Sequence, residues 1–324
     1  MTHLKKFSFL TLALSLFIGF TSCDKNDDDP APAPQQKTIA GIAADNPDFS
    51  ILVDALTRTN LVDAVNDPNA NLTVFAPTNA AFAALLTELG LADLDAVEAA
   101  LGNDGLKTVL LYHVLGAEVK SSMVEMGYAS TLATNSSNDA LTFFISTDNG
   151  VMINDRATVK EVDIDASNGV IHVIDQVILP ISLFELLKVN PKFSSLVTAL
   201  MVADGDLDDL LMNNAGPVTL FAPDDVAFGD LLTELNLTDL NAAVAALGTD
   251  GLAEVLTYHV VSGNINSDEV PSGSVTTANG EMFSIDLTNG VNITDANARM
   301  STVTQVDIQG TNGVIHVINT VLLP

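Results

Sequence analysis

The chain carries one sequence pattern twice, and this duplication restricts the possible folds more than any other feature. Three blocks of the first half return in the second half, in the same order and at closely similar spacing. They are NGVIHVID (168–175) and NGVIHVIN (312–319), TVFAPTNAAF (73–82) and TLFAPDDVAF (219–228), and LLYHVL (110–115) and LTYHVV (256–261). A long internal repeat indicates one structural unit made twice. We therefore predict two abutting domains of one fold, at residues 38–180 and 181–324, because each copy ends in a Leu-Pro pair and no linker separates them.

The first half of each copy predicts helices, and the second half predicts strands. Apolar residues from Phe49 to Leu56 recur at the i, i+3, i+4 and i+7 positions of one helical face. Further along, the turns at 148–150 and 289–290 contain Asn-Gly between alternating segments, which is a β-hairpin signal. Helices followed by antiparallel strands indicate an α+β domain.

The composition excludes several classes of function. The chain has 12 Lys and Arg against 41 Asp and Glu, a net charge of −29, so it would repel the phosphate backbone of a nucleic acid. Its single cysteine, Cys23, excludes an intramolecular disulfide. The sequence also contains no GxSxG motif, no HExxH motif and no Gly-rich phosphate loop. These absences leave little support for a nucleophilic or metal-dependent enzyme.

The N-terminus predicts export. Residues 1–22 combine two early lysines with an apolar run too short to span a membrane comfortably, which is typical of a signal peptide. The sequence FTSC resembles the end of a bacterial lipoprotein signal, which would make Cys23 the lipidated first residue. Residues 23–37 then form a disordered acidic and Pro/Ala-rich tether. The alternatives are a plain secretory signal and an uncleaved anchor.

The repeated blocks resemble the fasciclin domain. TVFAP with its following helix, then Tyr-His-Val, then NGVIHVI with a Leu-Pro end, occur in this order in both copies. The resemblance implies two tandem fasciclin-like domains. Each would be a β-wedge of two small antiparallel sheets, with helices packed in its first half. It also implies adhesion or extracellular association rather than catalysis.

The resemblance places candidate adhesion contacts at two segments of each copy. In animal matrix members, a segment with Asp-Ile stands just before the NGV block. Only the Asp and Ile of that segment match here. The Tyr-His pair is also implicated in adhesion in the family. The candidate contacts are Asp163, Ile164, Tyr112 and His113 in the first copy, and Asp307, Ile308, Tyr258 and His259 in the second. A structural role remains the alternative for all of them.

The remaining histidines and acids favour structural roles. His172 and His316 stand in strands that are apolar on both faces, so we predict that each lies in a core with its ring nitrogens hydrogen-bonded. The acidic run at 204–209 resembles the start of a calcium loop but lacks the Gly and Glu that an EF-hand requires, so a turn and helix cap is favoured. We predict no metal and no cofactor.

These observations predict a non-enzymatic adhesion protein of the cell envelope. Its partner would be an envelope or matrix protein or a polysaccharide, and it would meet the membrane only through its lipid anchor. We expect it at the outer membrane, either at the cell surface or on the periplasmic face. Two tethered copies would bind multivalently. The alternative functions are a binding module for a small apolar ligand or a glycan, and an enzyme in which a histidine and a carboxylate converge in a cleft.

Overall fold

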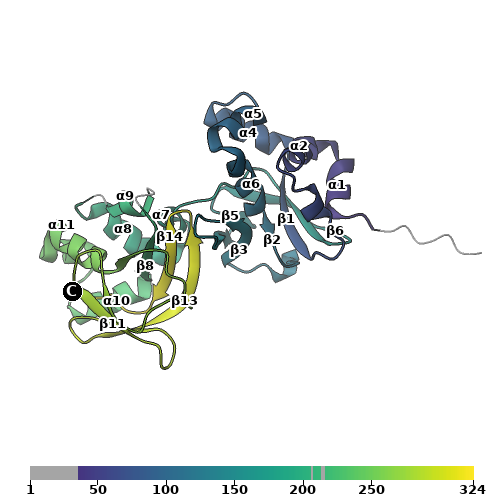
Figure 1. Cartoon of the computed structure of the whole chain (residues 1–324). Helices are drawn as coiled ribbons and strands as arrows, with labels where there is room; N and C mark the ends of the chain where they lie inside the picture. The colour runs from purple at the N-terminus through teal and green to yellow at the C-terminus, as the bar shows by residue number, and fades with distance from the viewer. Residues whose placement is uncertain (1–35, 206, 213–215) are drawn as a thin grey trace, which may run out of the picture. The chain divides into compact units, whose positions relative to one another are not determined.

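The structure is a computed structural model that describes residues 36–205, 207–212 and 216–324 (Figure 1). The predicted signal segment and the lipidation residue Cys23 lie outside the described residues. Residues 36–324 form one compact unit that contains both copies. Within the described ranges, no helix is long and apolar enough to cross a membrane.

Helices dominate the first half of each copy, as the periodicity predicts. In the first copy they are α1 (Ile39–Asp45), α2 (Ser50–Arg58), α3 (Val62–Asn66), α4 (Asn79–Leu89), α5 (Leu94–Leu101) and α6 (Asn103–Tyr112), with 3-10 turns η1 (Pro47–Phe49) and η2 (Ser121–Met123). In the second copy they are α7 (Leu183–Lys188), α8 (Ser194–Val202), α9 (Leu207–Met212), α10 (Asp225–Glu234) and α11 (Leu240–Tyr258), with η3 (Pro191–Phe193). Thr78 caps α4 by accepting a hydrogen bond from the N–H of Ala81, and Asp224 caps α10 through Ala227 in the same way.

Strands make up one seven-stranded sheet in each copy. In the first copy they are β1 (Leu72–Pro77), β2 (Val114–Leu115), β3 (Gly127–Thr134), β4 (Ala140–Ser146), β5 (Met152–Ile153), β6 (Ala157–Ala166) and β7 (Gly169–Ile174). In the second they are β8 (Val218–Pro223), β9 (Val260–Ser262), β10 (Gly273–Thr276), β11 (Met282–Asp286), β12 (Asn292–Thr294), β13 (Met300–Gly310) and β14 (Gly313–Ile318). The orders β2-β1-β7-β6-β5-β4-β3 and β9-β8-β14-β13-β12-β11-β10 match strand for strand. The predicted α+β class is confirmed.

The prediction of two small antiparallel sheets differs from the structure in two respects, because each copy has one seven-stranded sheet and one pairing in that sheet is parallel. β1 runs parallel to β7, with Leu72 opposite Gly169 and Pro77 opposite Ile174, and β8 runs parallel to β14. All four of these strands are buried along their whole length, which suits a parallel pairing. The helices between them in the chain provide the long crossover that parallel strands need. Each sheet is therefore mixed.

Each copy buries apolar side chains on both sides of its sheet. Val74 of β1 packs with the helices, whereas its neighbour Phe75 faces a second cluster formed by the antiparallel strands. There Phe75 packs edge-to-face on Phe143, with the ring centroids 5.5 Å apart. Phe221 and Phe283 repeat this pair in the second copy at 5.4 Å. The duplication thus extends from sequence to side-chain packing.

The two copies contact each other through the β3–β4 hairpin. The carboxylate of Asp139 accepts hydrogen bonds from the side-chain amides of Asn264 and Asn266, each at 2.7 Å. The hydroxyl of Thr142 donates to the backbone carbonyl of Gln309 at 3.0 Å. Thr142 and Gln309 are both 3% exposed. These polar groups are therefore part of the buried structure of residues 36–324.

Candidate functional site

The candidate Asp-Ile segment lies on a β-bulge at the same place in each copy. The pairing of β6 with β7 shifts register between Glu161 and Ile164, and the pairing of β13 with β14 shifts between the corresponding residues of the second copy. Asp163 and Asp307 both adopt φ of 59°, a left-handed conformation that Asp tolerates better than most residues. The bulge turns the side chain of each aspartate toward a neighbouring loop.

Each bulge aspartate uses its carboxylate within its own domain. Asp163 accepts hydrogen bonds from the backbone N–H of Ser121, at 2.8 Å, and from its hydroxyl. Asp307 does the same with Ser267, at 2.8 Å from the N–H and 2.5 Å from the hydroxyl. The Ser121 hydroxyl and N–H hold the pKa of Asp163 below its usual value, because they stabilise the charged carboxylate. The carboxylates thus fix the loop before β3 and the equivalent loop before β10.

The histidines of the two NGVIHVI segments, His172 and His316, hydrogen-bond the backbone of the same bulges. Nδ1 of His172 accepts a hydrogen bond from the backbone N–H of Asp163 at 3.2 Å, while Nε2 lies 2.9 Å from the carbonyl of Val119. This arrangement requires the hydrogen to be on Nε2. His316 repeats both bonds, with Asp307 at 3.3 Å and Ile265 at 2.9 Å. Each histidine is nearly fully buried and joins the bulge to the loop that the aspartate also holds.

The exposed apolar side chains at the bulges are valines. Val162 is 43% exposed and Val306 is 41% exposed, whereas Ile308 is 1% exposed and Ile164 is half-buried. Sequence reasoning missed the two valines, because a bulge interrupts the alternation from which strand faces are predicted. A partner approaching either bulge would meet the valine before the aspartate.

The Tyr-His pairs lie in the cores, away from solvent. Tyr112 is 0% exposed; its hydroxyl donates to the carbonyl of Thr142 at 2.6 Å and accepts from the Asn154 amide at 3.1 Å. His113 lies with Nδ1 2.7 Å from the carbonyl of Val109, and its Nε2 accepts from the N–H of Ile178 at 2.9 Å. These side chains bind the end of α6 to the antiparallel strands and to the final segment of the copy.

The second copy repeats this arrangement. Tyr258 is also 0% exposed, and its hydroxyl donates to the carbonyl of Met282 at 2.8 Å. His259 bonds the carbonyl of Val255 at 2.8 Å and the N–H of Leu322 at 2.9 Å. Burial lowers the pKa of His113 and of His259 to about 4, so both rings are neutral at physiological pH. Neither Tyr-His pair presents a polar atom to a partner.

No cluster of three or more metal-binding side chains occurs within residues 36–205, 207–212 and 216–324. Asp206, which the sequence suggests as a helix cap or calcium ligand, lies outside the described residues. The four histidines described above direct both ring nitrogens at backbone groups. In this arrangement none of them directs a ring nitrogen toward a substrate.

The apolar cavities of the first copy are small. One of about 20 Å³ lies beside Phe49 and His113, and another of about 60 Å³ lies between Phe82 and Leu106. For comparison, an apolar cavity of about 150 Å³ binds benzene. A cleft of about 670 Å³ near Arg156 and Lys188 is lined by polar as well as apolar side chains. The larger space therefore suits a hydrophilic ligand better than a lipid.

A family model of the fasciclin domain matches residues 47–180 and 191–324. The chain belongs to the fasciclin domain family. The two matches cover both copies, which agrees with the duplicated strand orders and with the duplicated bulges.

Curated relatives of several kinds are similar to this fasciclin chain. Protein sll1483 of Synechocystis is 44% identical over 146 residues, which is 44% of this chain and 73% of that protein. The transforming growth factor-beta-induced protein ig-h3 of Sus scrofa is 27% identical over 270 residues, 82% of this chain and 37% of ig-h3. The cell surface glycolipoprotein MPB83 of Mycobacterium bovis is 32% identical over 152 residues, 45% of this chain and 61% of MPB83. The chain thus spans a little over a third of ig-h3.

Among solved structures, the chain is similar to a FAS1 domain pair from the insect cell adhesion molecule fasciclin I. The TM-score is 0.48 with 18% sequence identity, over 87% of this chain and 95% of the other.

Proposed function

We propose that this protein is a non-enzymatic adhesion protein of the cell envelope that binds its partner through the two bulge surfaces. The observation that supports this role most directly is the repetition of an exposed valine beside a rigidly held bulge in each copy. A hydrogen bond from the N–H of Ser121 to the Asp163 carboxylate, and one from the N–H of Asp163 to Nδ1 of His172, fix the first bulge before any partner arrives. A preorganised contact loses little entropy on binding.

The bulge surfaces comprise Val162 with Asp163 and Ile164, and Val306 with Asp307, whereas Ile308 is buried beneath its bulge. The aspartates position the bulges and the valines make the apolar contact. Tyr112, His113, Tyr258 and His259 contribute by holding each sheet to its last helix, because their side chains are buried. Two weak contacts on one chain reinforce each other against a repetitive partner, such as an envelope or matrix protein or a polysaccharide.

Replacement of the valines tests the assignment. V162E and V306E each place a charge at one bulge, and the double variant places a charge at both. We expect each single variant to weaken attachment to envelope extract or matrix polysaccharide several-fold, and the double variant to lose about 100-fold or more, since avidity is lost. V226E is the matched control, because Val226 is 69% exposed on α10 and belongs to neither bulge. Unchanged attachment of the double variant, with unchanged far-ultraviolet circular dichroism, would refute the assignment.

The protein is further proposed to be a lipoprotein anchored through Cys23. The signal-like residues 1–22, the Cys after a small residue and the acidic stretch that follows support this, as does the similarity to a protein named a cell surface glycolipoprotein. Metabolic labelling with a palmitate analogue should label the native chain and not the C23S variant. C23S should also move from the membrane fraction to the soluble exported fraction. Equal labelling of the two chains would contradict the proposal.

A glycan-binding module is the second candidate function. The cleft of about 670 Å³ beside Arg156 and Lys188 supports it, because hydrogen-bonding side chains line that cleft. K188A should weaken binding to a glycan array if this cleft is used. V162E and V306E should leave that binding unchanged, which distinguishes the two candidates.

A further inference from the structure

The outer face of the antiparallel strands in the second copy is almost free of charge. Residues that pair across strands point to the same face. Ser274 lies opposite Ser284, Ser284 opposite Thr294, and Thr294 opposite Met300, so one row crosses all four strands from β10 to β13. Met282 lies two positions before Ser284 and shares its face. We call the outward side chains of β10, β11, β12 and β13 as far as Thr302 the β10–β13 face.

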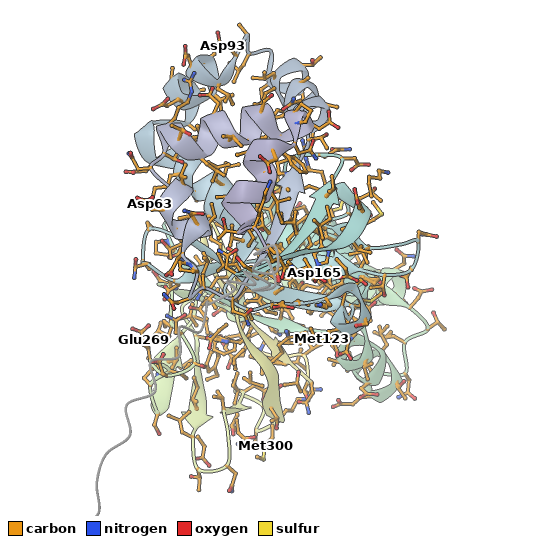
Figure 2. The ribbon with its side chains drawn as sticks, turned by 90° about the vertical axis from the view of Figure 1, so that its right-hand side faces the viewer. Asp63, Asp93, Met123, Asp165, Glu269 and Met300 are labelled. Carbon is orange, nitrogen blue, oxygen red and sulfur yellow. The ribbon has the colours of Figure 1, made fainter. Side chains whose placement is uncertain are left out.

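This face is exposed and partly apolar. Met282 is 57% exposed and Met300 is 69% exposed, whereas the alternate residues Phe283 and Ile293 are buried beneath them. Figure 2 labels Met300 on the strands of the second copy, with its side chain at the surface. Asp286 is the one ionisable side chain of the face. This face is thus almost uncharged in a chain that has 41 acidic residues.

The corresponding face of the first copy is already a protein contact. Tyr128 and Phe144, the counterparts of Ser274 and Ser284, are paired across β3 and β4. The hydroxyl of Tyr128 donates to the carbonyl of Leu186 at 2.8 Å, and its ring packs against the core of the second copy. Thr142, the counterpart of Met282, is 3% exposed. The same face of this fold is therefore covered by a fasciclin domain in one copy and uncovered in the other.

Charge disfavours a head-to-tail arrangement, in which the β10–β13 face of one chain would pack on the first copy of the next chain. The side chains with which the second copy hydrogen-bonds the first are neutral: Asn264, Asn266 and Gln309. The first copy has Glu118, Lys120 and Asp165 at the corresponding positions, and Nζ of Lys120 lies 2.9 Å from Asp165. Covering these charges with methionine and serine would remove their hydration without new partners. The surface around Glu118, Lys120 and Asp165 in a second chain therefore does not match the β10–β13 face.

We propose that the β10–β13 face is a self-association surface on which two chains meet face to face about a twofold axis. A twofold contact joins the same patch of each chain, so each nearly uncharged face meets another, with Asp286 at the end of β11 as its one ionisable side chain. Met282 and Met300 lie within the contact, and the acidic surface of each chain stays outside it. A dimer of this kind presents four fasciclin domains instead of two, whatever partner those domains bind.

Sedimentation velocity of residues 36–324 tests the proposal, since these residues form one compact unit. We expect the wild-type mass to rise toward a dimer from micromolar to near-millimolar concentration, and added salt to strengthen association by screening the net negative charge. The M282D/M300D variant should associate at least about tenfold more weakly, because it buries unpaired charges.

M201D is the matched control, because Met201 is 67% exposed on α8 and outside the face. It should dimerise like the wild type. A wild-type chain that stays monomeric at every concentration and salt level would overturn the proposal, as would equal weakening by M201D. Circular dichroism of each variant excludes unfolding as the cause.

Discussion

His113 and His259 show how strongly the hydrogen bonds of a buried histidine depend on its protonation state. In each ring, Nδ1 donates to a helix carbonyl and Nε2 accepts a backbone N–H from the last segment of the copy. A second proton on Nε2 would face that N–H directly, so the charged ring has no acceptor there. Burial and this hydrogen bonding together favour the neutral ring.

The first prediction concerns the pH dependence of stability. The pKa of His113 and of His259 is about 4 in the folded protein, against about 6.5 in an unfolded chain. Between these values the unfolded chain binds more protons, so stability is full above pH 6.5 and falls as the pH drops toward 4. Each histidine should contribute a slope of about 1.4 kcal/mol per pH unit in that range.

Urea unfolding at a series of pH values measures this slope. The H113Q/H259Q variant is the control, since glutamine does not titrate, and its slope should be shallower than that of the wild type. Proton NMR of the native protein should show both rings neutral down to about pH 4. Titration of either ring near pH 6.5 in the folded state would contradict the prediction.

The second prediction concerns Asn168, whose side chain does more than begin a turn. Its Oδ1 accepts from the N–H of Ile39 at 2.9 Å, and its Nδ2 donates to the carbonyls of Val65 and Asp67 at 3.0 Å. N168A leaves these backbone groups without partners and should lower the free energy of unfolding by about 2–4 kcal/mol. Urea denaturation measures the loss. S136A, in an exposed loop, should change stability by less than about 0.5 kcal/mol.

At the scale of elements, the parallel pair β1·β7 depends on a glycine. Gly169 has φ of +142°, and a Cβ at this position would lie 1.9 Å from the carbonyl oxygen of Leu72. Gly313 of β14 has φ of +150° and would place a Cβ 1.9 Å from the carbonyl oxygen of Val218. The approach of the neighbouring strand thus excludes every side chain at the start of the last strand.

The third prediction is that G169A disrupts the first copy and G313A disrupts the second. Because the backbone of the neighbouring strand occupies the space, relief requires the strands to separate. Hydrogen exchange should show lost protection in the copy that carries the substitution. G229A is the control: Gly229 lies within α10 with nothing within 4 Å of a built Cβ, so stability should rise by about 0.5–1 kcal/mol. Retained protection in G169A would contradict the steric argument.

The elements differ in how far the sequence predicts them. The apolar periodicity of α2 and the Asn-Gly hairpin turns are local signals, and the structure contains both elements where these signals stand. The parallel direction of β1 and β7 was not predicted, because an apolar strand buried on both faces has the same sequence pattern in either direction. The bulge at Asp163 was missed for a related reason: nothing in alternation marks the position of an extra residue.

At the scale of the whole molecule, polar groups hold the two copies together. Gln309 of the second copy accepts hydrogen bonds from two residues of the first, from Thr142 at its backbone carbonyl and from Asn135 at its side chain, at 3.1 Å. Its side-chain amide also donates to Asn266 of its own copy, at 2.5 Å, which orients both residues in the contact. Amides and a carboxylate of this kind specify one arrangement of the two copies, because each buried group needs its particular partner. The sequence gives no local sign of this contact, since its residues are spread over both copies.

The fourth prediction is that weakening this contact, by removing its side-chain bonds around Asp139 and Gln309, separates the unfolding of the two copies. D139A leaves the amides of Asn264 and Asn266 without their acceptor, and Q309A removes the side-chain bonds to Asn135 and Asn266. The double variant should unfold in two calorimetric transitions, whereas the wild type should unfold in one. D148A, in an exposed turn of the first copy, should keep the single transition. A single transition in the double variant would show that the copies are coupled by other means.

The pairing of β1 with β7 also determines when each copy can fold. The two strands of this pair stand near opposite ends of the copy in sequence, so β1 stays without β7 until nearly the whole copy has been synthesised. Closing so long a loop is entropically costly and slow. We expect a nascent chain cut before residue 169 to remain open and accessible to proteases, and one extended past residue 180 to become resistant. If the chain is exported as proposed above, a copy that delays its own closure in this way would suit passage through a secretion channel as an extended chain.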